Sequence, residues 1–117
     1  MAVKSFEVFF KLCNTHKLMG FSTGVHEVSK ESVLIRKIQA ESKRLINNSA
    51  DMSELLNSSD DYIKFWSAMG CIENAHCSDI AIEKLEDLLS NNAAYSITFR
   101  AGLIISMYKN GALFDYI

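Results

Sequence analysis

The sequence has no proline, only five glycines and only three cysteines among its 117 residues. Because proline is the strongest helix breaker, its absence leaves changes of chain direction to glycine, asparagine and serine. The cysteines, Cys13, Cys71 and Cys77, are odd in number and accompany no secretion signal, which argues against a disulfide framework. We expect three reduced thiols, buried as small apolar residues.

Long apolar runs and a strong charge of one sign are also missing. No stretch approaches the roughly 18 uninterrupted apolar residues of a membrane span, and Lys4 and Glu7 interrupt the region where a signal peptide needs an apolar run. We therefore expect a cytoplasmic protein without membrane contact. The net charge of −2 lacks the basic field of a dedicated nucleic-acid binder, so no direct nucleic-acid partner is expected.

What is present is 49% hydrophobic residues, enough for the core of one domain spanning residues 1–117. No segment alternates with period two, whereas apolar residues recur at helical spacing, which predicts an all-α fold of about six helices. The expected helices run from a cap at Ser5 to about Met19, from about Val25 to Ile46 as one helix or two, from Asp51 to Leu56, from about Asp61 to Asn74, from a cap at Ser78 through Asp79 to about Leu89, and from about Ala94 to Lys109.

Two of these segments have one apolar and one charged face. In 79–89 the predicted buried side is Ala81, Ile82, Leu85, Leu88 and Leu89, and the predicted outward side is Asp79, Glu83, Glu86 and Asp87. In 25–46 a narrow stripe of Val28, Ile35, Ile38, Ser42 and Leu45 faces the core, opposite Lys30, Lys37 and Arg44, with Arg36 and Lys43 beside them.

A partial internal repeat appears at a spacing of 34 residues. Residues 63–68, followed by Cys71, align with residues 97–102, followed by Ile105. In each copy a branched apolar residue precedes two small residues, Ser67 and Ala68 or Ala101 and Gly102, which would let a neighbouring helix approach closely. The alternative interpretation is that any two amphipathic helices align passably.

These residues resemble the HEAT-like helical repeat, and in particular a family of small bacterial proteins built from a few such helices. The family's repeat reads approximately Val-Arg, two residues, Ala-Ala, then Leu, and this chain has Ile63-Lys64, two residues, Ser67-Ala68, then Cys71 and Ile72. Lys64, the large Trp66 and Gly102 depart from the pattern. The resemblance implies an αα-superhelix of short repeats. It also implies the role that such small proteins often have, immunity against bacterial toxins, including those of contact-dependent inhibition.

Catalytic and metal-binding motifs are weak by comparison. Cys71, His76 and Cys77, or Cys13 and His16, lack the paired spacing of a zinc site, and no phosphate-binding glycine loop, nucleophile elbow or H-E-x-x-H is present. Cys13 and His16 lie one helical turn apart and could form a nucleophile pair, but no third residue that would orient the histidine is apparent. We expect no enzyme activity, no cofactor and no metal.

The near-neutral net charge conceals a division along the chain. Residues 1–48 carry eight basic and four acidic side chains, a charge of +4, and residues 49–117 carry four basic and ten acidic ones, a charge of −6. If the helices stack in sequence order, the acidic residues could form one surface that attracts a basic partner. The alternative is an ordinary solvated helix face.

Together the charge division and the resemblance favour an immunity protein that binds a cognate toxin one to one. A nuclease toxin such as an RNase fits, because its basic cleft could be occluded by an acidic surface. The expected partner-binding residues are Asp60, Asp61, Tyr62, Trp66, Asp79, Glu83, Glu86, Asp87 and Tyr95. For Trp66 core packing is an equal alternative. Other candidate functions are a HEAT-like scaffold, or a nucleic-acid-associated module that uses the basic face of 25–46.

Overall fold

The computed structural model describes residues 6–19, 25–91 and 95–110, except for the side chains of 25–30 and 95–96. All of the secondary structure in this part of the chain is helical, so the predicted all-α class is confirmed. The six helices of the described residues are α1 (Phe6–Met19), α2 (Val25–Asn47), α3 (Met52–Leu56), α4 (Asp61–Glu73), α5 (Ser78–Ser90) and α6 (Tyr95–Lys109). Residues 25–47 form one continuous helix rather than two.

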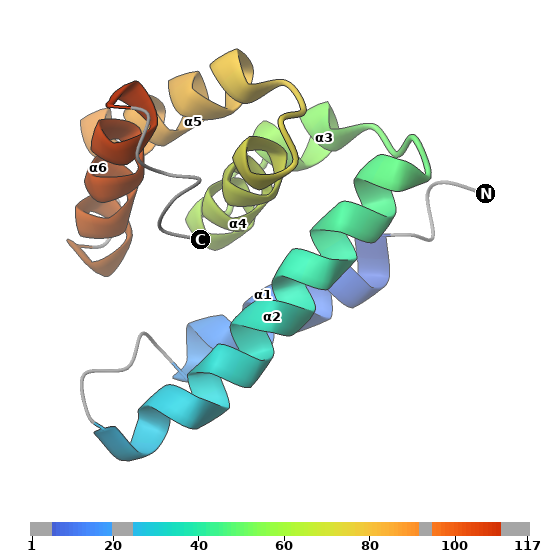
Figure 1. Ribbon diagram of the computed structural model, residues 1–117, viewed down its shortest axis with the longest axis vertical. Helices are drawn as coiled ribbons and strands as arrows, with labels where there is room; N and C mark the ends of the chain where they lie inside the picture. Colours follow the sequence, from blue (N-terminus) through green and yellow to red (C-terminus); the bar gives the residue numbers. More distant parts are fainter. Residues whose placement is uncertain (1–5, 20–24, 92–94, 111–117) are drawn as a thin grey trace.

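Helix α4 is the centre of the fold. It packs against each of the other five described helices, and its buried side chains point in all directions around its axis. A helix with buried side chains on every side belongs in the interior. Residues 65–68 are all buried, and the one polar side chain among them, Ser67, donates its hydroxyl to the backbone oxygen of Lys64 at 3.1 Å. Around it, α1 and α2 lie side by side in opposite directions, and α5 and α6 pack against each other (Figure 1).

The crossing of α2 and α4 is unusually close. At Gly70 of α4, a Cβ atom would lie 2.5 Å from Ser42 Cβ and 2.6 Å from Ser42 Oγ, both of them side-chain atoms of α2. Real Cβ atoms do not approach other atoms so closely, so this crossing requires glycine at position 70. The predicted core stripe of α2 is seen in Ile38, Ser42 and Leu45, which are buried, whereas Val28 lies outside the described side chains.

The repeat-like segments occupy α4 and α6, and α5 packs against both. Ser67, Ala68 and Ala101 are buried, as expected for small residues where helices meet. The interpretation of Gly102 was wrong, because a Cβ atom there would have no neighbour within 4 Å. No neighbouring helix therefore approaches closely at position 102, and the packing does not depend on a small residue there.

Helix ends follow local hydrogen bonds. Asp60 caps α4 by accepting hydrogen bonds from the backbone N–H groups of Tyr62 and Ile63, and Asp51 caps α3 by accepting one from Ser53. The predicted cap at Ser78 was wrong: Ser78 is already helical, and the N-cap position is Cys77, in a left-handed conformation with no side-chain cap. Ser5 lies outside the described residues.

One predicted core position is exposed. Leu89 lies in the last turn of α5, one residue before the helix ends at Ser90, and is 44% exposed. Asp87, expected to point outward, is half-buried. Of the three thiols, Cys13 and Cys71 are buried as predicted, whereas Cys77 is exposed because it lies in the α4–α5 turn.

Candidate partner-binding site

The outer face of α5 carries an exposed acidic group consisting of Asp79, Glu83 and Glu86. They lie there because Ala81, Ile82, Leu85 and Leu88 occupy the opposite side of the helix and are buried. Among the described residues, Glu86 faces Lys109 of α6 at 3.5 Å, with both side chains at least half exposed. Such a pair is weak in water, so the face keeps most of its negative charge.

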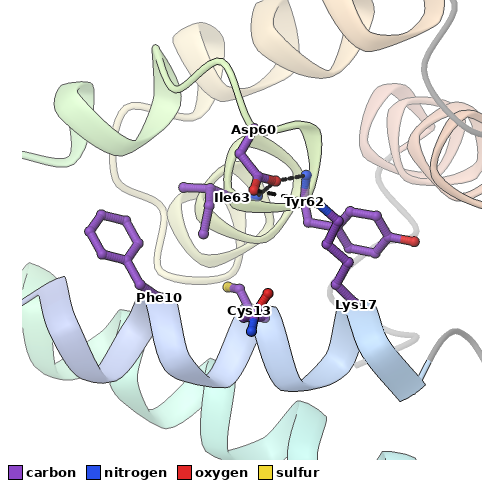
Figure 2. Close-up of a pocket in the computed structure, with 7 residues that line it drawn as sticks. Phe10, Cys13, Lys17, Asp60, Tyr62 and Ile63 are labelled. Carbon is purple, nitrogen blue, oxygen red and sulfur yellow. Dashed lines mark hydrogen bonds and ion pairs between the residues drawn. The ribbon is translucent and has the colours of Figure 1, made fainter.

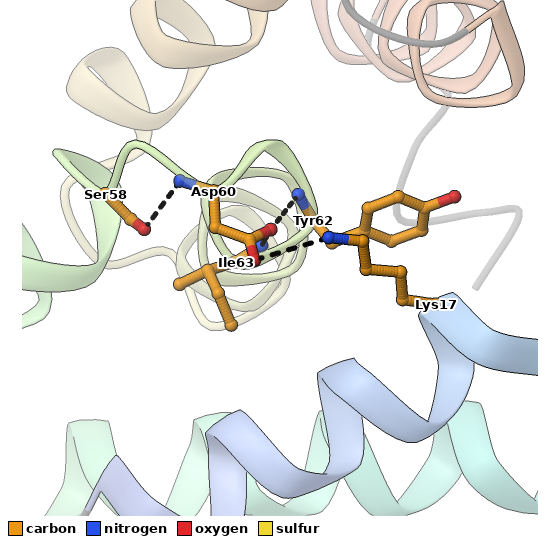
Figure 3. A network of polar contacts seen from close by, with 5 residues as sticks. All are labelled: Lys17, Ser58, Asp60, Tyr62 and Ile63. Carbon is orange, nitrogen blue, oxygen red and sulfur yellow. Dashed lines mark hydrogen bonds and ion pairs between the residues drawn. The ribbon is translucent and has the colours of Figure 1, made fainter.

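A second acidic group lies at the start of α4, next to α1. Asp60 is the N-cap residue of α4 and accepts the capping hydrogen bonds through Oδ1. Its second carboxylate oxygen, Oδ2, lies 3.8 Å from Nζ of Lys17 on α1 (Figure 3). Asp61 and Tyr62 follow in the first turn of α4, both half-buried. The predicted acidic residues thus belong to two elements with different basic neighbours, Lys17 and Lys109. That they form one continuous surface remains a prediction.

Of the three aromatic residues expected to contact a partner, one is placed in the core. Trp66 is only 4% exposed, with its ring edge-on to His16 at 5.1 Å and to Phe65 at 5.0 Å between centroids. It stabilises the centre of the fold and presents no surface to a partner, because α4 is covered on every side. The side chain of Tyr95 lies outside the described residues. Of these three aromatic residues, Tyr62 is therefore the one that the structure places, half-buried, near the surface.

The basic residues of α2 divide into exposed and paired ones. Arg36, Lys37 and Lys43 are exposed, whereas the side chain of Lys30 lies outside the described residues. Arg44 donates through Nε to Glu41 Oε1 at 2.8 Å and through Nη2 to the other carboxylate oxygen, a two-point pair that raises the pKa of the guanidinium. Arg44 is therefore paired with a carboxylate of the same helix, although its side chain is 47% exposed.

The pair of Cys13 and His16 acquires a third member in the structure. His16 is fully buried and shares a hydrogen bond of 2.8 Å with Glu31 of α2, which joins α1 to α2. Such a carboxylate could orient an imidazole for catalysis. However, burial raises the pKa of the Cys13 thiol well above its usual value, and the negative charge of Asp60 raises it further. A catalytic thiol needs a lowered pKa, so the geometry favours a buried structural cysteine.

The thiol of Cys71 behaves in the same way, because burial, with a smaller contribution from Cys77, raises its pKa to about 12. Across the described part of the chain, no three His, Cys, Asp or Glu side chains gather as a metal site would require. No helix in the same residues combines the length and apolar character of a membrane span.

A pocket of about 240 Å³ lies between α1 and the start of α4 (Figure 2). Its lining consists of Phe10, Cys13, Asn14, Lys17, Asp60, Tyr62 and Ile63. The α1 residues recur at steps of three and four, so they share one side of that helix. Phe10, one of the lining residues, is 44% exposed.

Comparison with known proteins does not assign the chain to a family. No protein-family model, curated protein or solved structure matches the chain.

Two residues that shape these sites were not identified in the sequence. In the sequence Lys17 is one of the eight basic residues of 1–48, and the structure shows it as the cation beside Asp60 and Tyr62. Glu31 is one of the four acidic residues of the same segment, and the structure shows it as the buried partner of His16. Both depend on how α1 packs against other helices. The one available signal was the position of Lys17 one turn after Cys13 and Asn14, on the side of α1 next to its apolar stripe.

Proposed function

We propose that this protein is a cytoplasmic immunity protein that neutralises a bacterial nuclease toxin by binding it one to one. The observation that carries the proposal is the exposed acidic face of α5, on which Asp79 and Glu83 form no ion pair with any other described residue. The HEAT-like pattern of 63–72 and 97–105 supports it, and we extend the proposal to a short helical-repeat stack formed by α4, α5 and α6.

The mechanism needs no chemistry from this chain. A nuclease binds phosphates in a basic cleft, and that cleft attracts an acidic helix face of similar dimensions. The three exposed carboxylates extend from Asp79 to Glu86 and therefore over about 10 Å of helix α5, so they can cover a cleft of that length. With its cleft occupied by α5, the toxin cannot bind its nucleic-acid substrate.

The proposal is tested with a charge reversal on α5. Glu83→Lys with Glu86→Lys changes two exposed side chains and leaves the buried face of the helix intact. We expect this double variant to bind the proposed toxin, sought in the neighbouring gene, about tenfold to hundredfold more weakly at low salt, and to lose protection of cells that express the toxin. Isothermal titration and a growth assay provide the two measurements.

The matched control is Glu7→Lys with Glu54→Lys, which gives the same change in net charge at exposed positions on α1 and α3. It should bind nearly as tightly as the original protein. Equal weakening by both double variants would show that only the total charge matters, and unchanged binding of the α5 variant would exclude α5 as the interface.

One observation favours a second candidate function, a nucleic-acid-associated module. Arg36, Lys37 and Lys43 lie exposed on α2. In that case a gel shift with duplex or single-stranded nucleic acid should appear at low salt, disappear as salt rises, and be lost in the variant with all three residues changed to alanine. Absence of a shift at low salt would remove this candidate.

A further inference from the structure

The pocket between α1 and α4 lies apart from the acidic face of α5 and already holds a cation. Nζ of Lys17 lies 3.8 Å from Asp60 Oδ2 and 5.7 Å from the centre of the Tyr62 ring (Figure 3). An ammonium group beside a carboxylate and over an aromatic ring is attracted by both. The geometry therefore identifies a position where this protein stabilises positive charge.

Lys17 occupies this position loosely. Its side chain is 49% exposed, that of Asp60 is 41% exposed, and the 3.8 Å between them exceeds the length of a hydrogen bond. Only Oδ1 of Asp60 serves the helix cap, by accepting from Tyr62 and Ile63 N–H, so Oδ2 is available to a stronger cation. Below it the pocket continues between the apolar side chains of Phe10, Cys13 and Ile63 (Figure 2).

We infer that this pocket receives an arginine side chain of the basic protein partner, with Lys17 displaced toward solvent. The inference rests on the proposed function and adds a second, specific contact to it. A guanidinium group fits better than an ammonium group, because it is planar and less strongly hydrated, stacks on the Tyr62 ring and still donates to Asp60 Oδ2. The methylene groups of the arginine would cover Phe10 and Ile63.

The pocket is tested without any toxin, with N-acetyl-L-arginine methylamide as the probe. Titration followed by ¹H–¹⁵N NMR should shift the amide signals of Cys13, Asp60 and Tyr62, with a dissociation constant in the millimolar range typical of a single side chain. The citrulline analogue, which has the same shape without the charge, should cause no such shifts. Equal shifts with both compounds, or none with the arginine probe, would overturn the inference.

Two variants locate the contact. Asp60→Asn retains a good N-cap but removes the charge, and it should weaken binding of the probe about threefold to tenfold. Lys17→Met retains the methylene stem but removes the competing cation, and it should tighten binding about twofold to fivefold. The matched control Lys11→Met removes a positive charge from an exposed position on α1 that does not line the pocket. Equal tightening by Lys17→Met and Lys11→Met would overturn the displacement of Lys17.

This test separates the two proposals. Specific binding of the probe together with toxin binding that is insensitive to charge reversal on α5 would reject the α5 interface and retain the pocket. Loss of toxin binding on α5 charge reversal, without any response to the arginine probe, would retain the proposed function and reject the pocket.

Discussion

The close crossing of α2 and α4 at Gly70 offers a direct test of the packing. Gly70 of α4 faces Ser42 of α2, and a Cβ atom at position 70 would lie 2.5 Å from Ser42 Cβ. Two carbon atoms in contact prefer about 3.5–4.0 Å, so Gly70→Ala creates an overlap of about 1 Å. The overlapping atom of Ser42 is bonded directly to the backbone, so α2 and α4 must move apart to relieve the overlap.

The expected cost follows from two opposing effects. An extra methyl group in a tightly packed interior typically costs about 1–3 kcal/mol. Alanine in place of glycine inside a helix stabilises it by about 1 kcal/mol. Because the overlap involves an atom fixed to the backbone, we take the upper part of the first range, about 2–3 kcal/mol. Gly70→Ala should then lower the free energy of unfolding by about 1–2 kcal/mol, and the melting temperature by about 4–8 °C.

Urea unfolding followed by circular dichroism, with the fluorescence of Trp66 as a second probe, measures this change. The matched control is Gly102→Ala in α6, where the new Cβ meets nothing within 4 Å, so only the helix preference acts and stability should rise by about 0.5–1 kcal/mol. In the double variant Gly70→Ala/Ser42→Gly the overlap is removed, and the two changes should be non-additive by about 1 kcal/mol or more. A Gly70→Ala protein as stable as the original would refute the close crossing.

Three further predictions follow from single residues. Ala75 follows α4 in the left-handed conformation, with φ = 52°, where His76 N–H donates to Cys71 O at 2.8 Å. Because glycine adopts this conformation without the steric cost of a Cβ atom, Ala75→Gly should stabilise the protein by about 1 kcal/mol in urea unfolding. Lower stability of this variant would contradict the helix-end geometry. Burial raises the pKa of Glu73, although the hydrogen bond from Gln39 at 2.7 Å lowers it in part, so the folded state binds a proton more tightly than the unfolded state. The contribution of the protonated Glu73 to the free energy of unfolding is therefore fully present below the ordinary glutamate pKa and is lost as pH rises through the pKa of Glu73 in the folded state. Glu73→Gln should be more stable than the original protein at pH 7 and equally stable near pH 3. A difference in stability that does not change with pH would argue against this. Finally, in the native protein iodoacetamide should label the exposed Cys77 quickly and leave the buried Cys13 and Cys71 unmodified, whereas all three should react in urea. Mass spectrometry measures the labelling. If Cys13 of the native protein is labelled as quickly as Cys77, the burial of Cys13 is contradicted.

Much of the fold could be predicted from local patterns. Asp60 and Asp51, each before an apolar run, mark the starts of α4 and α3, and the asparagines after them mark the ends. The start of α5 was misplaced because Ser78 has the side chain of a cap, whereas Cys77 adopts the left-handed conformation for reasons set by the turn after α4. The residue preferences of the helix start alone do not predict a left-handed cysteine at this position.

The candidate site depends on contacts between distant residues, which local patterns do not contain. Spacing placed Glu83 and Glu86 on the outer face of α5, because helix periodicity alone decides that side. It could not decide between surface and core for Trp66, because an apolar residue on a helix with apolar residues on all sides has no preferred face. The contact of Gly70 with Ser42 and the pair of Lys17 with Asp60 arise only when separate helices meet.

The most direct measurement is a titration of this protein into the proposed cognate nuclease toxin, sought in the gene next to its own, with cleavage of RNA as the readout. If the protein neutralises the toxin one to one, activity should fall linearly and reach zero at one molar equivalent, and the α5 charge-reversal variant should require a large excess. Full cleavage in the presence of a tenfold excess of the original protein would contradict the proposed function.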